Sequence, residues 1–176
     1  MGHTPENVAF QPLNIAVMTV SDSRTDADDK SGNILVDRLT EAGHKLVEKK
    51  IVVDDIYQMR AVVSGWIAEP DVHAVITTGG TGLTGRDVTP EAMKILYDKE
   101  IEGFGEVFRQ ISYNLIKTST IQSRAIAGLA NGTVIFSLPG SPGACIDGWD
   151  GIIVHQLDSR TKPCNLVEMM PRFLEK

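Results

Sequence analysis

The sequence predicts a single α/β domain in which a mainly parallel sheet lies between two layers of helices, with a hairpin near the C-terminus. Apolar runs suited to buried strands alternate with segments whose apolar residues have helical spacing. The strand-helix-strand-helix-strand order at the start of the chain is typical of right-handed crossovers in a parallel sheet. Two strand-like runs around Asn131-Gly132 form the strongest short hairpin signal.

The first half of the chain supplies the parallel part of this sheet. Nearly continuous apolar runs at 13–20, 46–53 and 72–77 are typical of strands buried on both faces. Between the first two runs, Leu35 and Leu39 share one helical face, and Gly43 stands where a helix would end. A second helix is expected over 56–67, so the order is βαβαβ.

The second half begins with a helix start at Thr89-Pro90, because proline fits the first helical position and threonine can cap. Another amphipathic helix is expected over 103–117, two strands within 124–138 and a last helix over 143–157. We expect a loose tail over residues 1–11, one domain over 12–160 and a C-terminal tail without clear period over 161–176.

Composition bounds the class of protein. The 176 residues are 42% hydrophobic and 23% charged, as in an ordinary globular domain. A formal charge of -6 leaves no broad basic surface for nucleic acid, so an anionic ligand would need a local binding device. Cys145 and Cys164 lack metal or redox spacing, and no apolar run reaches the ~18 residues of a membrane span. We expect a cytoplasmic protein without nucleic-acid or membrane partners.

The most informative segment is the glycine-rich loop at residues 79–87, which follows the third expected strand. Glycines let several backbone N–H groups approach one anion, so the loop predicts phosphate binding. A dinucleotide fingerprint is disfavoured, because four residues separate the last glycine from Pro90 and no second strand follows at 98–106. A P-loop lacks its lysine here, and the remaining alternative is a tight turn without function.

Two acidic residues suggest a metal ion beside that anion. Asp54 and Asp87 both follow expected strands, and the carboxyl ends of parallel strands meet at one edge of a sheet. Few carboxylates with several waters suit Mg²⁺ bound to nucleotide phosphates. Either residue alone would more often be a helix cap or solvated surface. Arg86 and Arg124 could each offer a planar fork to phosphate, and Arg124 is the better placed, directly before a strand.

The stretch TTGGTGLTGRDVTPEA at 77–92 resembles the signature of the MoaB/MogA family of molybdenum cofactor biosynthesis, which includes molybdopterin adenylyltransferase. Further matching stretches extend the resemblance over roughly residues 13–160: SDS at 21–23, VVDD at 52–55, EGFGEVFRQIS at 102–112, IQSRAIAG at 121–128 and LPGSPGA at 138–144. The segment SRTKPCN at 159–165 looks more like the MoaB branch than MogA.

The resemblance implies a three-layer, molybdopterin-binding-like fold, assembled as a homotrimer or homohexamer. It implies Mg²⁺-dependent adenylylation of molybdopterin by ATP, with release of pyrophosphate. Asp54 and Asp87 would take the Mg²⁺ and catalytic roles. The residues implied to bind substrate or nucleotide are Ser21, Asp22 and Arg86, the phosphate cradle Gly79, Gly80, Thr81 and Gly82, the pterin-side group Ser112, Ser123 and Arg124, and the nucleotide-side group Pro139, Gly140 and Ser141.

Two other functions stay open from the sequence. A member of the family could bind molybdopterin or nucleotide without catalysis, as an accessory protein of the same pathway. A phosphate-binding scaffold unrelated to molybdenum would also carry the glycine loop. For adenylylation, no general base stands out and none is needed, because the attacking phosphate is already ionised.

Overall fold

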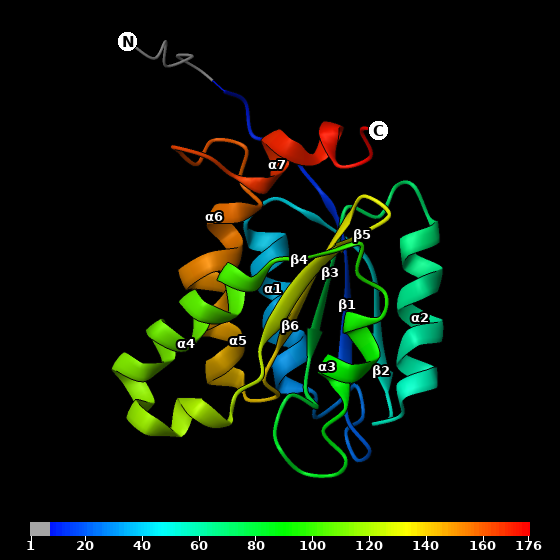
Figure 1. Cartoon of the computed structure of the whole chain (residues 1–176), viewed down its shortest axis with the longest axis vertical. Coiled ribbons are helices and arrows are strands. Elements are labelled where there is room, and N and C mark those ends of the chain that lie inside the picture. The colour runs from blue at the N-terminus through cyan, green and yellow to red at the C-terminus, as the bar shows by residue number, and fades with distance from the viewer. Residues whose placement is uncertain (1–7) are drawn as a thin grey trace.

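The computed structural model describes residues 8–176, which form a six-stranded sheet covered by helices (Figure 1). Its strands are β1 (Asn14–Val20), β2 (Lys45–Val52), β3 (Ala74–Thr78), β4 (Lys99–Glu100), β5 (Ile126–Ala130) and β6 (Thr133–Leu138). They lie in the order β2-β1-β3-β6-β5-β4. The pairs β1·β2, β1·β3 and β3·β6 are parallel, whereas β5 is antiparallel to both β6 and β4. The predicted parallel sheet and hairpin are therefore confirmed.

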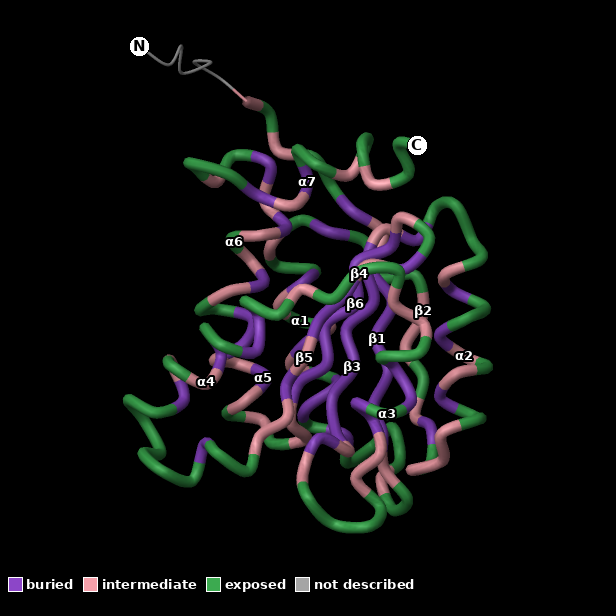
Figure 2. Tube along the Cα trace, in the orientation of Figure 1, coloured by how far each residue is buried: buried purple, intermediate pink, exposed green. Residues whose placement is uncertain are grey.

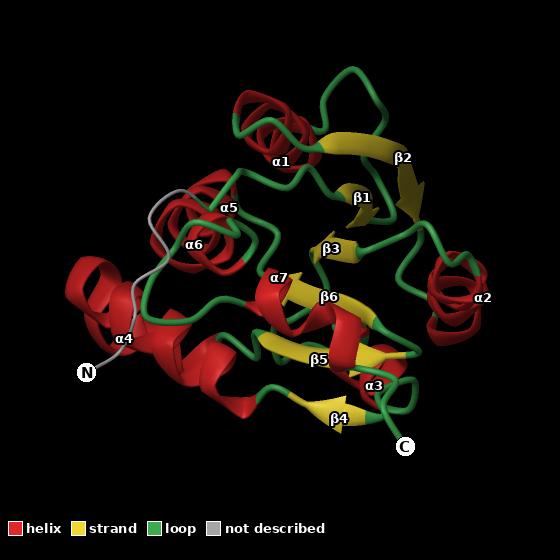
Figure 3. Cartoon of the chain, turned by 90° about the horizontal axis from the view of Figure 1, so that it is seen from above, coloured by secondary structure: helices red, strands yellow, loops and turns green. Residues whose placement is uncertain are grey.

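Helices cover both faces of this sheet, as the view from above shows (Figure 3). One face carries α1 (Lys30–Glu41), α4 (Glu102–Ile116), α5 (Pro142–Gly148) and α6 (Val154–Gln156), and the other carries α2 (Ile56–Ala68) and α3 (Thr89–Lys94). A π-helical turn, η2 (Trp149–Ile153), joins α5 to α6, so the predicted last helix is nearly continuous. None of the helices in residues 8–176 has the length and apolar character that a membrane span requires.

The central strands explain why their sequences are apolar without a break. Side chains alternate between faces along a strand, and both faces of β1 are covered, so neighbouring residues enter different cores. Ile15 and Val17 join the cluster under α1, α4 and α5, whereas Ala16 and Met18 join the cluster under α2 and α3. Figure 2 shows β1, β3 and β6 buried along most of their length.

Caps place the helices that follow the strands. Asp29 begins α1 by accepting a hydrogen bond from the Gly32 amide at 3.0 Å, and Asp55 begins α2 by accepting from the Tyr57 and Gln58 amides. Gly43, at a φ of 93°, ends α1 as predicted, since this backbone conformation favours glycine. Both acidic caps come after parallel strands, β1 and β2, and so lie at the carboxyl edge of the sheet.

Several local expectations need correction. Thr89 does not cap α3, because it is the first residue of that helix and Val88 stands at the cap position; its buried hydroxyl donates to the Gly79 carbonyl at 2.8 Å. Neither the short edge strand β4 nor the 3₁₀ helix η1 (Lys117–Gln122) that follows α4 was predicted from the sequence. The expected C-terminal tail contains a helical turn, α7 (Leu166–Met169), and a 3₁₀ turn, η3 (Met170–Arg172).

The expected N-terminal tail falls partly outside the described residues, at 1–7. Its remainder is held by the body of the protein. Ser159 Oγ accepts a hydrogen bond from the Gln11 amide at 3.0 Å and donates to the Ala9 carbonyl at 2.8 Å. The Phe10 ring packs against His44 and lies under the Arg160 guanidinium. Residues 9–11 thus belong to the folded unit.

Candidate functional site

The glycine-rich loop lies at the carboxyl edge of the sheet, which we call the rim, between β3 and α3 (lower part of Figure 1, green). Two of its glycines have a backbone that other residues rarely adopt, with φ of 106° at Gly79 and 64° at Gly80. A Cβ at Gly79 would stand 2.3 Å from the Val20 carbonyl oxygen, and one at Gly140 would stand 3.2 Å from the Gly79 Cα. Glycine therefore lets the loops after β1, β3 and β6 meet.

Thr89 fixes the start of the loop. Its amide donates to the Gly80 carbonyl at 2.9 Å, and its hydroxyl donates to the Gly79 carbonyl at 2.8 Å. These two bonds pair the carbonyls of Gly79 and Gly80, which would otherwise lack a donor, and orient both carbonyls toward Thr89. The loop is consequently held at the point where it leaves the strand.

Asp87 lies at the far end of the loop and stabilises it from within. Its Oδ2 accepts hydrogen bonds from the Thr84 amide at 2.8 Å and the Thr84 hydroxyl at 2.6 Å. Partial burial works to raise the pKa of the Asp87 carboxyl, but the bonds from Thr84 outweigh it and keep that pKa below its usual value. The carboxylate is therefore ionised beside Gly82, where an added Cβ would lie 2.8 Å from Oδ2.

Asp54 reaches the same loop from the end of β2. A Cβ at Gly80 would stand 3.0 Å from Asp54 Oδ1, so the two aspartates lie against glycines two residues apart. Partial burial, with the nearby negative charge of Asp22 and a smaller one from Asp87, raises the pKa of the Asp54 carboxyl. None of the hydrogen bonds found in residues 8–176 ends on this carboxylate. The negative charge of Asp54 is therefore not offset by a hydrogen-bond donor among the described residues.

Arg86 is paired across the rim with Asp22, which follows β1. The guanidinium donates through Nε at 3.0 Å and Nη2 at 2.5 Å to Asp22 Oδ2, while Asp22 Oδ1 accepts from the Asp54 amide at 3.1 Å. The hydrogen bonds from Arg86 hold the pKa of the Asp22 carboxyl below its usual value. Both side chains are exposed, so a phosphate could compete with Asp22 for the guanidinium.

A cavity of about 310 Å³ opens beside the loop, between it, the α4–η1 segment and the turn before α5. One side is apolar, with Phe108, Ile116 and Ala144, and the other side is polar but uncharged apart from Asp87. The remaining lining residues are Gly80, Thr81, Gly82, Ser112, Ser119, Gln122, Ser123, Pro139, Gly140 and Ser141. Such a cavity suits a polar ring system with a phosphate on the glycine-loop side.

Most of the residues expected at a site therefore converge on the rim, although some have structural partners. Ser21 Oγ accepts hydrogen bonds from the amides of Ser23 and Arg24 and shapes its own loop. Ser141 Oγ caps α5 by accepting from the Ala144 amide at 3.2 Å. The Pro139 carbonyl accepts from the Thr78 hydroxyl, and the Gly140 carbonyl accepts from Arg24 and Ser31.

Arg124 reaches the rim as predicted, but all three nitrogens of its guanidinium bond to protein acceptors. They donate to the Gly82 carbonyl, to the Asp87 carbonyl and to the Glu91 carboxylate. Three further residues at the rim were not predicted from the sequence: Glu91, Ser119 and Gln122. Glu91 ends the RDVTPE stretch, and that motif was the signal available for it; the other two depend on η1, which no pattern indicated.

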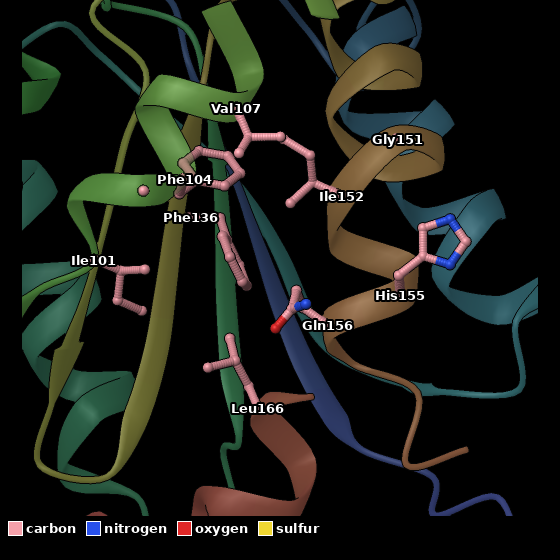
Figure 4. Close-up of a pocket in the computed structure, with 10 residues that line it drawn as sticks. Ile101, Phe104, Val107, Phe136, Gly151, Ile152, His155, Gln156 and Leu166 are labelled. Atoms are coloured by element: carbon pink, nitrogen blue, oxygen red, sulfur yellow. The ribbon is translucent and has the colours of Figure 1, made fainter. Parts of the chain in front are cut away.

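A separate hollow of about 360 Å³ lies between α4 and the η2–α6 segment (Figure 4). The described residues that line it are mainly apolar, with Phe104, Val107, Phe136 and Ile152 around its centre and His155 and Gln156 as its polar members. It contains none of the residues expected at the site. The rim therefore remains the place where charged side chains, glycines with positive φ and a cavity coincide.

Fold and rim together define an α/β protein that would bind an anionic ligand at the carboxyl edge of a mainly parallel sheet. The family model described as a probable molybdopterin binding domain matches residues 16–159. The chain belongs to this family, in the MoaB branch of the MoaB/MogA proteins of molybdenum cofactor biosynthesis.

Relatives and solved structures agree on this branch. The chain is 56% identical over 156 residues to molybdenum cofactor biosynthesis protein B of Escherichia coli, covering 89% of this chain and 92% of the relative. A crystal structure of a molybdenum cofactor biosynthesis protein B superposes with a TM-score of 0.83 at 45% identity, over 85% of this chain and 94% of that one. The tungsten cofactor synthesizing protein MoaB from Pyrococcus furiosus gives a TM-score of 0.74 at 39% identity, over 82% and 92%.

Proposed function

We propose that this protein acts in molybdenum cofactor biosynthesis as a cytoplasmic molybdopterin adenylyltransferase that uses Mg²⁺ and ATP. An oxygen of the terminal phosphate of molybdopterin attacks the α-phosphorus of ATP. The bond from that phosphorus to the oxygen bridging to the β-phosphate breaks, and pyrophosphate leaves with the electron pair. The products are adenylylated molybdopterin and pyrophosphate.

The observation that carries the proposal is the position of Asp54 and Asp87 against two glycines of the glycine-rich loop that line the cavity. The reaction brings two polyanions together, so the protein must hold them in line and offset their charge. Asp54 and Asp87 lie against Gly80 and Gly82, the part of the loop that lines the cavity. A nucleotide phosphate at the loop would thus meet a pterin phosphate coming from the cavity.

The residues at the rim fit a magnesium ion. Asp54 carries a pKa raised by burial and by neighbouring negative charge, which a bound cation would offset, and it has no donor from residues 8–176. No group of three or more histidine, cysteine or acidic side chains suited to a metal occurs in that part of the chain. Two carboxylates completed by phosphate oxygens and water are the usual Mg²⁺ arrangement. Bound there, Mg²⁺ would neutralise phosphate charge.

The side chains have separable tasks in this proposal. Backbone amides of the glycine-rich loop bind phosphate oxygens, and Arg86 leaves Asp22 to contact the charge that develops on the leaving pyrophosphate. Ser112 and Ser123 line the cavity and offer hydroxyl groups to the pterin. Proton transfer is not required, because the attacking phosphate is ionised at neutral pH.

The names of the relatives support a role in molybdenum cofactor biosynthesis, and they do not state which reaction the protein catalyses. A non-catalytic protein of the same pathway would also bind molybdopterin or nucleotide. The two functions differ in turnover, so binding of molybdopterin and of Mg-ATP should first be measured by titration. Pyrophosphate release is then followed with both substrates present.

We expect pyrophosphate and adenylylated molybdopterin in equal amounts, and many turnovers for each protein chain. Omitting Mg²⁺ should abolish both products. Tight binding of both substrates without pyrophosphate release would favour the accessory role. Failure to bind molybdopterin would instead favour a phosphate-binding scaffold of another pathway.

A further inference from the structure

Arg124 is joined to the glycine-rich loop by three hydrogen bonds and to the following helix, α3, by a fourth. The Arg124 amide donates to the Thr81 carbonyl at 3.0 Å, and its Nε donates to the Gly82 carbonyl at 2.8 Å. Its Nη2 donates to the Asp87 carbonyl at 2.6 Å, and its Nη1 donates to the Glu91 carboxylate. Acceptors on both sides of the exposed tip of the loop therefore share one guanidinium.

The two carbonyls that the guanidinium contacts are five residues apart in sequence, at Gly82 and Asp87. A planar fork with fixed donor directions sets the distance between them, whereas a flexible ammonium group acts as a single point charge. The side chain is mostly covered, with 29% of it exposed, which limits its access to a ligand. Its partner Glu91 is the first acidic residue of α3 and is half-exposed.

Glu91 keeps the fork in place. Although burial works in the opposite direction, the hydrogen bond from Arg124 lowers the pKa of the Glu91 carboxyl, so it stays ionised at neutral pH. Glu91 is itself anchored because its carbonyl accepts from Arg60 Nη2 at 2.9 Å. The chain of contacts runs from α3 through Glu91 and Arg124 to the loop.

We infer that Arg124 and Glu91 are positioning residues that close the glycine-rich loop to the width needed for phosphate, and that Arg124 does not bind the pterin. The inference rests on the proposed function in one respect, namely that the spacing set by Arg124 serves to bind phosphate. The contacts themselves do not depend on it. Arg124 acts on the substrate through the amides of residues 80–87, by fixing the direction in which they point.

The test compares three variants in the full-length protein without substrates: Arg124→Lys, Arg124→Gln and Glu91→Ala. Hydrogen exchange of residues 80–88 is followed by mass spectrometry, with thermal unfolding to confirm that each variant is folded. The amides of Thr84 and Asp87 are hydrogen-bonded within the loop and report its opening. We expect exchange there to accelerate about tenfold or more in all three, because each removes a charge-assisted bond worth roughly that factor.

Arg60→Lys is the matched control. Arg60 also donates from its guanidinium to two backbone carbonyls, those of Glu91 and Ala92, but it does not touch the loop. Exchange of residues 80–88 should stay within about twofold of the unmodified protein, since no bond to the loop is lost. Comparable acceleration in the control would mean that any loosening of α3 opens the loop, and would overturn the inference.

The alternative role makes the opposite prediction for lysine. If Arg124 neutralised a ligand phosphate directly, Arg124→Lys would keep the charge, preserve slow loop exchange and raise mainly the KM for molybdopterin. If Arg124 holds the loop, lysine and glutamine should lower kcat to a similar extent, and Glu91→Ala should follow them. Slow exchange in the lysine variant or in Glu91→Ala would overturn the inference, whether or not adenylylation itself is observed.

Discussion

Asp87 combines a structural and a chemical task in one carboxylate. It accepts two hydrogen bonds from Thr84, which hold the loop, and its negative charge borders the cavity. An asparagine carbonyl can accept the same two bonds without the charge. The two tasks can therefore be separated by one substitution.

Asp87→Asn should lower turnover by at least about a hundredfold, the usual cost of losing one electrostatic element of an active site. The fold should survive, because the oxygen that accepts from Thr84 is kept. Turnover and thermal unfolding of the same preparation check both statements. A rate within a few-fold of the unmodified protein would remove Asp87 from the mechanism.

Asp54→Asn should stabilise the ligand-free protein while lowering its turnover. Burial and the charge of Asp22 raise the pKa of the Asp54 carboxyl in the folded state, so the folded protein binds a proton more readily than the unfolded chain. Stability is therefore lost as pH rises between the unfolded and folded pKa, and the ionised group costs stability at neutral pH. We expect a gain below ~1 kcal/mol, because solvent screens this half-exposed rim.

The same substitution should also flatten the pH dependence. Urea unfolding at pH 4 and pH 7, with and without Mg²⁺, measures the effect. The gain from Asp54→Asn should be larger at pH 7 than at pH 4, and Mg²⁺ should stabilise the unmodified protein more than the variant. A variant that is less stable at pH 7 would contradict the charge assignment at this carboxylate.

At the scale of elements, the glycine-rich loop depends on its strained start more than on its glycine content. Gly79 has a positive φ and faces the Val20 carbonyl, whereas a Cβ at Gly85 would meet no atom within 4 Å. The four glycines are therefore not equivalent, although the sequence alone presents them as one motif.

Gly79→Ala should destabilise the protein by roughly 2 kcal/mol or more, since the new Cβ would strain the backbone and press on Val20. Gly85→Ala is the control, and its effect should stay within about 0.5 kcal/mol. Chemical denaturation of both variants makes the comparison. Equal stability of the two would show that the positive φ at Gly79 is not required.

The part of the candidate site that could be predicted from the sequence is the part that directly follows the strands. Asp54, Asp87 and the glycine-rich loop follow strands whose apolar runs are clear, and parallel strands bring their ends together. Ser119 and Gln122 could not be found in this way, because they lie on η1, a 3₁₀ segment without apolar period. The partners of Arg124 were also hidden, since side-chain contacts between distant loops depend on the tertiary fold.

At the scale of the whole molecule, the α4–η1 segment carries apolar side chains that nothing in residues 8–176 covers (lower left of Figure 1). Leu115 is 61% exposed and Ile121 75% exposed, close to the cavity wall formed by Ile116 and Ser119. A group of exposed apolar side chains on one segment is typical of a surface that contacts another protein chain.

From the family resemblance we propose that the protein assembles as a homotrimer or homohexamer, and this surface is the candidate contact. Light scattering coupled to size exclusion should give three or six times the chain mass of 19.2 kDa. Substituting Leu115 and Ile121 together by serine should lower that mass, whereas Leu174→Ser, at an exposed leucine near the C-terminus, should not. A monomer at all concentrations would contradict the prediction.

The fold itself was largely predictable because the apolar runs are long and their periods distinct. The strand edges moved by one or two residues, and the hairpin formed around Asn131-Gly132 as expected. Thr89 shows why finer detail was not predicted, since α3 begins one residue earlier than a threonine cap would require and the Thr89 hydroxyl donates to the Gly79 carbonyl. The contact with Gly79 depends on how the loop and the helix meet in the folded chain, which no local pattern indicates.

Adenylyl transfer from ATP labelled at the α-phosphorus tests the central claim most directly. With molybdopterin and Mg²⁺ present, the label should appear in a pterin product that also contains adenosine, and unlabelled pyrophosphate should be released in equal amount. Asp87→Asn should give little of either product. Label that remains in ATP or appears only as free AMP, in a preparation shown to bind molybdopterin, would contradict the proposed function.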